Sequence, residues 1–264
     1  MRSRSLLLAG LIAALGAAGA RAADLPEIKA RGTLRVLVMP DVTRPEFYSL
    51  KPGSQPGFDA EMLDGFAKLL RLKVEVVPQK GWDQLIPALL DKKGDLIAGR
   101  FTATEGRRKV VLFTSEVFPS RNVVINRKPK KPVLTLEQLK AEKVGTNKGS
   151  SMAEAIAAAG VPNVDDGLAP GAYDEALKSG RITAALWGVE SAIALQKDDP
   201  EIQLGMFLGP PLSLAYALRN DEPDLLKALN EYIENVRHTP TWSRLVVKYF
   251  GEAAPEILKK ARSN

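Results

Sequence analysis

The chain has 264 residues, of which 37 are lysine or arginine and 31 are aspartate or glutamate, and it contains no cysteine and one histidine. The missing cysteines exclude disulfides, thiolate metal sites and cysteine nucleophiles, and a single histidine, His238, supplies multi-histidine metal sites and Ser-His-Asp triads poorly. The composition therefore gives no reason to expect a bound cofactor or metal.

The first 22 residues have the pattern of a secretory signal peptide. Arg2 and Arg4 give a basic start, an apolar run covers about 6–19, and the small residues of Ala20-Arg21-Ala22 predict cleavage after Ala22. The apolar run is short for a membrane span, so we prefer a cleaved signal to an uncleaved anchor. We therefore expect an exported protein.

Cleavage changes both the size and the charge of the chain. It removes three arginines and no acidic residue, so the formal net charge falls from +6 to about +3, and 242 residues remain. This length suffices for one large or two modest domains. The remaining charge is small and evenly mixed, which argues against nucleic-acid binding.

Strand and helix patterns alternate in the first part of the mature chain. In chain order they predict a strand over 33–39, a helix with apolar residues every four positions over 58–70, a strand over 73–77, a helix over 82–90 and a strand over 95–98. This β-α-β-α-β order predicts a parallel sheet covered by helices.

The alternation starts again after Arg121. The pattern predicts strands over 123–125, 144–145, 182–187 and 212–219, and helices over 135–143, 151–160, 173–179, 190–197 and two more between 223 and 251. Two of these helices begin with capping-box patterns, Thr135 with Gln138 and Ser151 with Glu154. Two successive α/β units predict two lobes, but composition leaves open how often the chain crosses between them.

Seven short motifs follow one another over nearly the whole mature chain. They are Gly32-Thr33-Leu34-Arg35-Val36, Gly57-Phe58-Asp59-Ala60-Glu61-Met62, Trp82-Asp83-x-Leu85-Ile86-Pro87-Ala88-Leu89, Gly94-Asp95-Leu96-Ile97-Ala98, Thr104-Glu105-Gly106-Arg107 with Phe113-Thr114, Gly149-Ser150-Ser151, and Thr241-Trp242 with Lys248-Tyr249-Phe250-Gly251. In this order they resemble family 3 of the bacterial extracellular solute-binding proteins, the polar-amino-acid group of ABC importers.

The resemblance implies the α/β type II periplasmic-binding-protein fold, with two lobes that are each a mostly parallel sheet flanked by helices. Residues 23–117 and 216–264 would form lobe 1, residues 122–211 would form lobe 2, and the two hinge crossings would lie at about 117–122 and 211–216. It further implies a periplasmic monomer that binds a small carboxylate-bearing ligand between its lobes and delivers it to an ABC permease in the inner membrane.

Arg107 is the first residue that the resemblance implies for ligand binding. A guanidinium directs two N–H groups at a carboxylate and stays charged at any relevant pH. The alternative is a surface arginine in a basic run with Arg108 and Lys109. Thr102, five residues earlier, would offer a hydroxyl and backbone groups to the ligand; the alternative is a threonine with ordinary strand preference.

The resemblance also implies contacts from a helix start and from two aromatic residues. Ser150 and Ser151 begin a helix, whose free N–H groups and dipole favour an anion, although plain N-capping by Ser151 needs no ligand. Trp82 lies where the family often places an aromatic side chain against the ligand, but it could equally belong to the core. Phe47 resembles the cleft aromatic of the family's first loop.

Two positions depart from the family pattern. Gly188 stands where the family usually has an acidic residue that pairs with the ligand's ammonium, and Glu190, two residues later, would need a shifted loop to replace it; its alternative role is a first-turn helix carboxylate. Arg100 stands where a small or hydroxylic residue is common. An added cation and a missing acid favour a ligand with more negative charge or no ammonium, such as an organic acid.

Two other functions remain open from the sequence. Some relatives on this fold are cyclohexadienyl dehydratases, which need a positioned acid with a tuned pKa. That position falls at Ser191 here, one residue from Glu190, so we expect a binding protein and no enzyme. Other relatives are accessory proteins of periplasmic dehydrogenase systems, and the altered cleft fits this role too.

Overall fold

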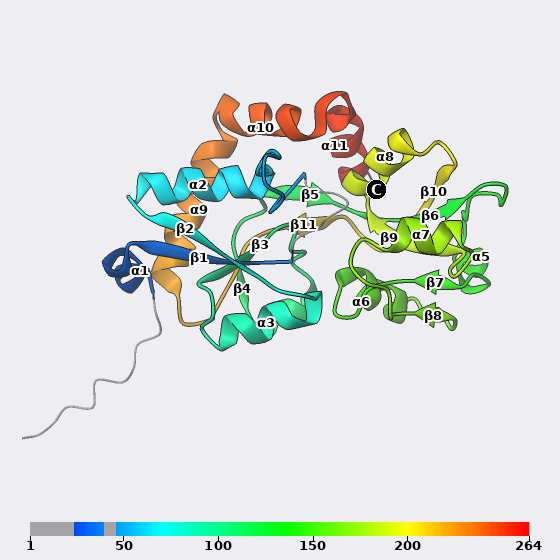
Figure 1. Cartoon of the computed structure of the whole chain (residues 1–264), viewed down its shortest axis with the longest axis horizontal. Coiled ribbons are helices and arrows are strands. Elements are labelled where there is room, and N and C mark those ends of the chain that lie inside the picture. The colour runs from blue at the N-terminus through cyan, green and yellow to red at the C-terminus, as the bar shows by residue number, and fades with distance from the viewer. Residues whose placement is uncertain (1–23, 40–45, 264) are drawn as a thin grey trace, which may run out of the picture.

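The computed structural model describes residues 24–39 and 46–263, and the expected signal peptide lies outside these ranges. Two α/β lobes lie side by side, as Figure 1 shows. The expected two-lobed α/β fold is confirmed. Among the described residues, no helix is both long enough and apolar enough to cross a membrane.

The first lobe is built on a five-stranded sheet in the order β2-β1-β3-β12-β4. Its strands are β1 (Thr33–Val38), β2 (Lys73–Pro78), β3 (Leu96–Ala98), β4 (Leu112–Phe113) and β12 (Ala217–Leu218). Strand β1 runs parallel to β2 and β3, whereas β12 runs antiparallel to β3 and β4. The sheet is therefore mixed, because the chain returns from the other lobe as the antiparallel strand β12.

Helices cover both faces of this first sheet. They are α1 (Leu25–Arg31), α2 (Phe58–Leu69), α3 (Trp82–Leu90), the short α4 (Glu105–Arg108), α9 (Pro223–Arg237) and α10 (Pro240–Phe250). Alternate residues of β1 face opposite ways: Val36 and Val38 pack in the core that contains α2 and α9, and Leu37 packs against α3. In Figure 1, α2 and α3 accordingly lie on opposite sides of the sheet.

The second lobe has a sheet in the order β10-β6-β9-β7-β8. Its strands are β6 (Asn122–Arg127), β7 (Val144–Gly145), β8 (Val164–Asp165), β9 (Ala184–Gly188) and β10 (Ile202–Phe207), and its helices are α5 (Leu136–Lys140), α6 (Ser151–Ala158), α7 (Tyr173–Lys178) and α8 (Val189–Asp198). Strand β7 runs parallel to β8 and β9, and β6 runs antiparallel to β9 and β10. This sheet is mixed as well.

A two-stranded antiparallel ladder of β5 (Phe118–Ser120) and β11 (Leu212–Leu214) lies between the two sheets. The sequence predicted one strand over 212–219, but the chain leaves the ladder after Leu214 and joins the first sheet as β12. Helix α11 (Ala254–Arg262), which follows a short 3-10 turn (Gly251–Ala253), packs against β5 and α8. The lobe limits given above remain a prediction.

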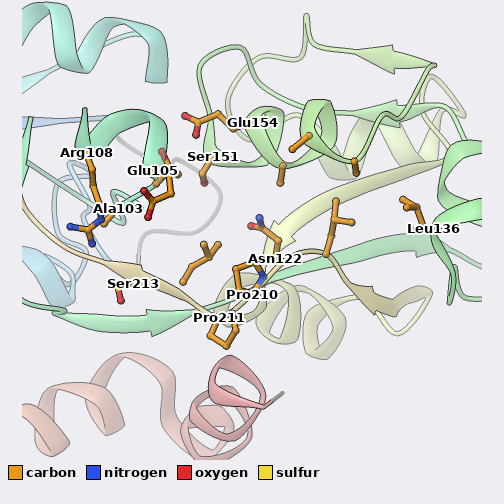
Figure 2. Close-up of a pocket in the computed structure, with 17 residues that line it drawn as sticks. Ala103, Glu105, Arg108, Asn122, Leu136, Ser151, Glu154, Pro210, Pro211 and Ser213 are labelled. Atoms are coloured by element: carbon orange, nitrogen blue, oxygen red, sulfur yellow. The ribbon is translucent and has the colours of Figure 1, made fainter. Parts of the chain in front are cut away.

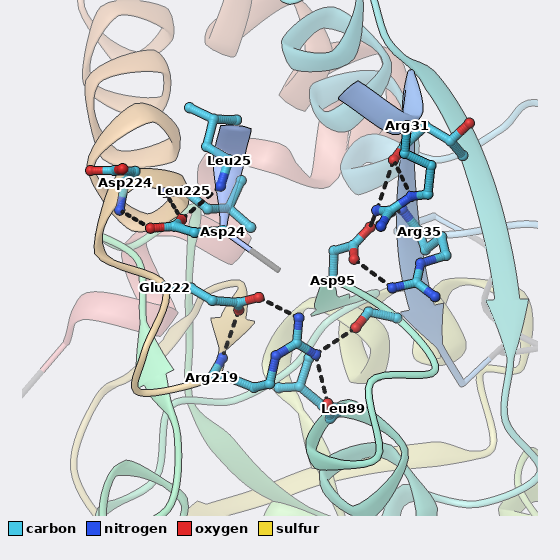
Figure 3. Close-up of polar contacts among 12 residues, drawn as sticks. Asp24, Leu25, Arg31, Arg35, Leu89, Asp95, Arg219, Glu222, Asp224 and Leu225 are labelled. Atoms are coloured by element: carbon cyan, nitrogen blue, oxygen red, sulfur yellow. Dashed lines mark hydrogen bonds and ion pairs between the residues drawn. The ribbon is translucent and has the colours of Figure 1, made fainter. Parts of the chain in front are cut away.

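Ion pairs and hydrogen bonds stabilise the end of the first sheet that lies away from the second lobe. Asp95, just before β3, accepts hydrogen bonds from the backbone N–H and the guanidinium of Arg35, at 2.7 and 2.9 Å, and also pairs with Arg31. Buried Arg219 pairs with Glu222 and donates to the carbonyl oxygen of Leu89 near the end of α3, as Figure 3 shows. Arg219 also donates to the carbonyl oxygen of Gly94, in the connection from α3 to β3. These contacts fix the amino ends of the strands, so the carboxyl ends of β1 and β3 remain available for a site.

Candidate functional site

A small cavity of about 20 Å³ lies between the two lobes. Residues from both lobes and from the connecting ladder line it: Trp82, Arg100, Thr102, Arg107, Ser120, Asn122, Ser150, Ser151, Met152, Glu190 and Leu214. Seven of the eight residues proposed from the sequence are among them. A space of this size holds about one water molecule, so the lobes meet closely in this conformation.

Arg107 is positioned by the short helix α4 and is only 5% exposed. Thr104 caps this helix, because its hydroxyl accepts the backbone N–H of Arg107. The Arg107 guanidinium donates to the carbonyl oxygen of Thr102 at 2.8 Å and, across the cleft, to that of Gly149 at 3.0 Å. It also lies 4.0 Å from the centre of the Phe101 ring. The alternative of a surface arginine is therefore wrong, and Arg108 and Lys109 are the exposed members of the basic run.

Burial lowers the pKa of the Arg107 guanidinium to about 10, and Glu154 opposes this shift. The Glu154 carboxylate lies 3.7 Å from Nε of Arg107 and is itself 43% exposed. At neutral pH the guanidinium stays charged, because its pKa remains about three units higher. The cavity wall therefore carries a buried cation with fixed orientation.

The start of helix α6 forms the facing wall, with one change from the expected capping. Ser150 is the N-cap, since its hydroxyl accepts the N–H of Ala153 at 3.1 Å. The prediction that Ser151 caps the helix was wrong by one residue. Ser151 instead donates its hydroxyl to that of Thr102 in the other lobe, at 3.0 Å. The helix N-terminus, which favours anions, thus faces the same cavity as Arg107.

Glu190 lies in the cavity wall, in the first turn of helix α8, and is 2% exposed. Ser120 donates its hydroxyl to the Glu190 carboxylate at 2.6 Å. Burial raises the pKa of Glu190, while Arg100 and the Ser120 hydroxyl oppose this rise. A Cβ atom at Gly188 would lie 2.1 Å from Oε1 of Glu190, so the carboxylate occupies the space that a side chain at 188 would need.

Arg100 lines the cavity from the first lobe and reaches across it. Its backbone has a φ of 64°, in the left-handed region that favours glycine. Buried Asp59 holds this backbone, because Oδ2 accepts the N–H groups of Gly99 and Arg100 at 3.1 and 2.9 Å. The guanidinium of Arg100 donates to the Ser191 hydroxyl of the second lobe at 2.6 Å. The Asp59 of the Gly-Phe-Asp motif therefore positions a cleft residue.

Replacing Asp59 with asparagine is expected to remove a pH dependence of stability. Burial raises the pKa of Asp59 from 3.8 to about 6. Between these pH values the folded state holds a proton that the unfolded state has lost, so stability falls as pH rises. Relative to the asparagine variant, the wild type should lose about 2.5 kcal/mol of unfolding free energy between pH 4 and pH 7. Urea unfolding of both proteins checks this; a constant difference would contradict the assigned pKa.

The two aromatic residues proposed from the sequence have different positions. Trp82 begins helix α3 and lines the cavity. Phe47 is 3% exposed and packs edge-on against Phe118 and Phe250, with ring centres 5.4 and 5.3 Å away. Phe47 therefore belongs to the aromatic core next to the connecting ladder, and we no longer propose it as a ligand contact.

Sequence reasoning missed four residues of the cavity wall. Ser120 and Asn122 flank the boundary between β5 and β6, Leu214 ends β11, and Met152 follows the serines of α6. The signal for the first two was the polar segment Ser120-Arg121-Asn122 between two apolar strand runs. Nothing in the local pattern distinguishes Leu214 or Met152, because their place depends on how the lobes meet.

A larger groove of about 670 Å³ lies beside the small cavity, and Asn122 and Ser151 line both. Its walls are mostly apolar. They are formed by α6, by the connection between β3 and α4 around Ala103, and by the segment over 208–213 that leads into β11. Figure 2 shows Pro210, Pro211 and Asn122 on one side of this groove and Ser151 and Glu154 on the other. Residues from both lobes therefore border this groove too.

The lobes approach each other closely at Gly149. This residue has a φ of 73°, and a Cβ atom there would lie 2.6 Å from the backbone nitrogen of Asp83 and 2.7 Å from its Cα. Asp83 belongs to helix α3 of the first lobe. The observed contact between lobes hence depends on the absence of a side chain at 149.

The comparisons with known proteins agree with this fold. A family model for the bacterial extracellular solute-binding proteins, family 3, matches residues 34–252. The L-cystine-binding protein TcyJ of Escherichia coli (strain K12) is 30% identical over 235 residues, which are 86% of each chain. Holo ArgBP from T. maritima matches with a TM-score of 0.75 at 27% identity, over 86% of this chain and 99% of that one.

Some of the similar proteins are named as enzymes. The membrane-bound lytic murein transglycosylase F of Stutzerimonas stutzeri (strain A1501) is 26% identical over 254 residues, which are 93% of this chain and 52% of that protein. This chain thus spans about half the length of that relative. The family match covers most of the chain, and the chain belongs to the bacterial extracellular solute-binding proteins, family 3.

Proposed function

We propose that this protein captures a small carboxylate-bearing molecule between its two lobes. The observation that carries the proposal is the convergence of Arg107 from one lobe and the N-terminus of helix α6 from the other on a single cavity. Both groups favour an anion, and each comes from a different lobe. A carboxylate placed between them would hold the lobes together.

The chemistry of the two walls supports this ligand class. The Arg107 guanidinium makes one hydrogen bond within its own lobe and one across the cleft, both to carbonyl oxygens. A ligand carboxylate is a better acceptor for a guanidinium than a neutral carbonyl, because charge-assisted hydrogen bonds are the stronger ones. The hydroxyls of Thr102 and Ser151 already meet across the cleft and can turn toward a bound oxygen.

Family membership supports the cellular role. Its members are extracellular solute-binding proteins, and the name of TcyJ states that it binds L-cystine. We infer that this chain acts as a periplasmic monomer after signal cleavage and delivers its ligand to an ABC permease in the inner membrane. The ligand is an amino acid or an organic acid.

Analysis of what the purified protein carries tests the proposal. Denaturation should release a carboxylate-bearing compound that mass spectrometry identifies. Titration of that compound into refolded protein should give one binding site by calorimetry and a rise in the thermal unfolding temperature. The proposal would be contradicted if no carboxylate is released and no amino acid or organic acid of a broad panel raises the unfolding temperature.

A further inference from the structure

We infer that Arg100 selects the ligand class of this site: its guanidinium reaches across the cleft to Ser191, beside Glu190, so that carboxylates without an α-ammonium bind better than the matching amino acids. This inference rests on the proposed function, because it concerns the ligand of the same cavity. Three structural observations lead to it.

The first observation is that Gly188 and Glu190 depend on each other. Glu190 turns back over Gly188, and its carboxylate lies where a Cβ atom at 188 would stand. The Ser120 hydroxyl, from the connecting ladder, holds the carboxylate in this position at 2.6 Å. Among the described residues that line the cavity, Glu190 is therefore the one with an acidic side chain.

The second observation is that Arg100 is held in place to meet this part of the cavity. The Asp59 carboxylate accepts the backbone N–H groups of Gly99 and Arg100, which keeps Arg100 at a φ of 64°. From there its side chain reaches Ser191, the residue next to Glu190 in helix α8. The Arg100 residue is thus held by Asp59 at its backbone and by Ser191 at its guanidinium.

The third observation is electrostatic. The positive charge of Arg100 lowers the pKa of Glu190 against the effect of burial, so the two side chains interact through space. An ammonium placed against Glu190 would lie beside this guanidinium and be repelled, whereas a hydroxyl or carbonyl oxygen at the same atom of the ligand would be accepted as a hydrogen-bond partner. The pair Arg100 and Glu190 therefore disfavours a ligand ammonium.

Matched pairs of compounds test the inference directly. Each pair is an L-amino acid and the 2-hydroxy acid with the same side chain, so that only the ammonium is exchanged for a hydroxyl. Calorimetry should show that the Kd of the wild type for the hydroxy acid is lower than its Kd for the amino acid by a factor of about ten or more. In Arg100→Gly this preference should disappear or reverse, because Glu190 can then accept the ammonium. Glycine suits the positive φ, so the variant is expected to fold.

Two further variants separate charge from packing. In Ser191→Ala the guanidinium loses its partner hydroxyl but keeps its charge, so the preference for the hydroxy acid should remain. In the double variant Arg100→Gly with Glu190→Gln, the amino-acid affinity gained by Arg100→Gly should be lost again. Thermal unfolding of each variant confirms that it is folded.

The outcomes distinguish this inference from the proposed function. If the wild type prefers the amino acid, or if the ratio is the same in Arg100→Gly, the inference is overturned while carboxylate binding stands. If neither protein binds any member of the pairs, and neither binds the compound released on denaturation, the proposed function fails and this inference fails with it.

Discussion

Replacing Arg107 with alanine is expected to weaken ligand binding by a factor of about 100 or more. Removal of one partner from a buried, hydrogen-bonded charge pair costs about 2–5 kcal/mol in binding free energy, which is a factor of roughly 30 to several thousand. Arg107 is 5% exposed and bonds to both lobes, so its loss removes a ligand contact and a contact across the cleft together. Calorimetric titration with the copurified compound measures the loss.

Two variants make this prediction specific. Arg107→Lys keeps the charge but cannot direct two parallel N–H groups, so it should recover only part of the affinity. Arg108→Ala removes the neighbouring cation, which is exposed and lies 5.2 Å from the centre of the Phe113 ring, and should bind as the wild type does. Thermal unfolding reports whether each variant is folded. Unchanged affinity in folded Arg107→Ala would refute the role of this residue.

Replacing Gly149 with alanine is expected to prevent the lobes from closing and to lower affinity about tenfold or more. The added Cβ atom would lie 2.6 Å from a backbone atom of Asp83, a contact that no side-chain rotation can relieve. Since the two residues belong to different lobes, the strain arises only when the lobes meet. The energy of closure would then oppose binding, because a ligand held by both lobes needs the closed state.

Gly180→Ala provides a matched control. Gly180 has the same φ of 73°, but nothing lies within 4 Å of a Cβ atom there, so both variants share the backbone strain and only one meets a neighbour. Small-angle scattering with saturating ligand should show compaction in the wild type and in Gly180→Ala, and less in Gly149→Ala. Equal compaction and equal affinity in both variants would show that the contact at Gly149 does not limit closure.

Local patterns in the sequence predicted two α/β units, and the resemblance to the family predicted how the chain divides them into lobes. Helix α2 follows from apolar residues repeated every four positions, and Thr135 with Gln138 forms the capping box that was expected. The proportion of parallel pairing was predicted less well. Strands β6 and β12 run antiparallel to their neighbours, and their direction depends on where the chain crosses between lobes, which no local pattern records.

The site residues that lie in a short, motif-defined turn or helix were predicted well. Those whose position depends on the contact between the two lobes were predicted less well. Arg107, Thr102 and the start of α6 are held by local turns, and they line one cavity as the motifs implied. Phe47 was misplaced because its ring is as suited to an aromatic core as to a cleft. The relation between Gly188 and Glu190 could not be predicted, since it depends on a side chain that folds back over its own helix start.

A crystal structure of the protein with its copurified compound tests the central claim most directly. We predict that the lobes enclose the ligand, that its carboxylate lies within hydrogen-bonding distance of the Arg107 guanidinium, and that the same group meets the first turn of α6. A ligand that lies instead in the groove of about 670 Å³ beside α6, with Arg107 still bonded to the carbonyl oxygens of Thr102 and Gly149, would contradict this account.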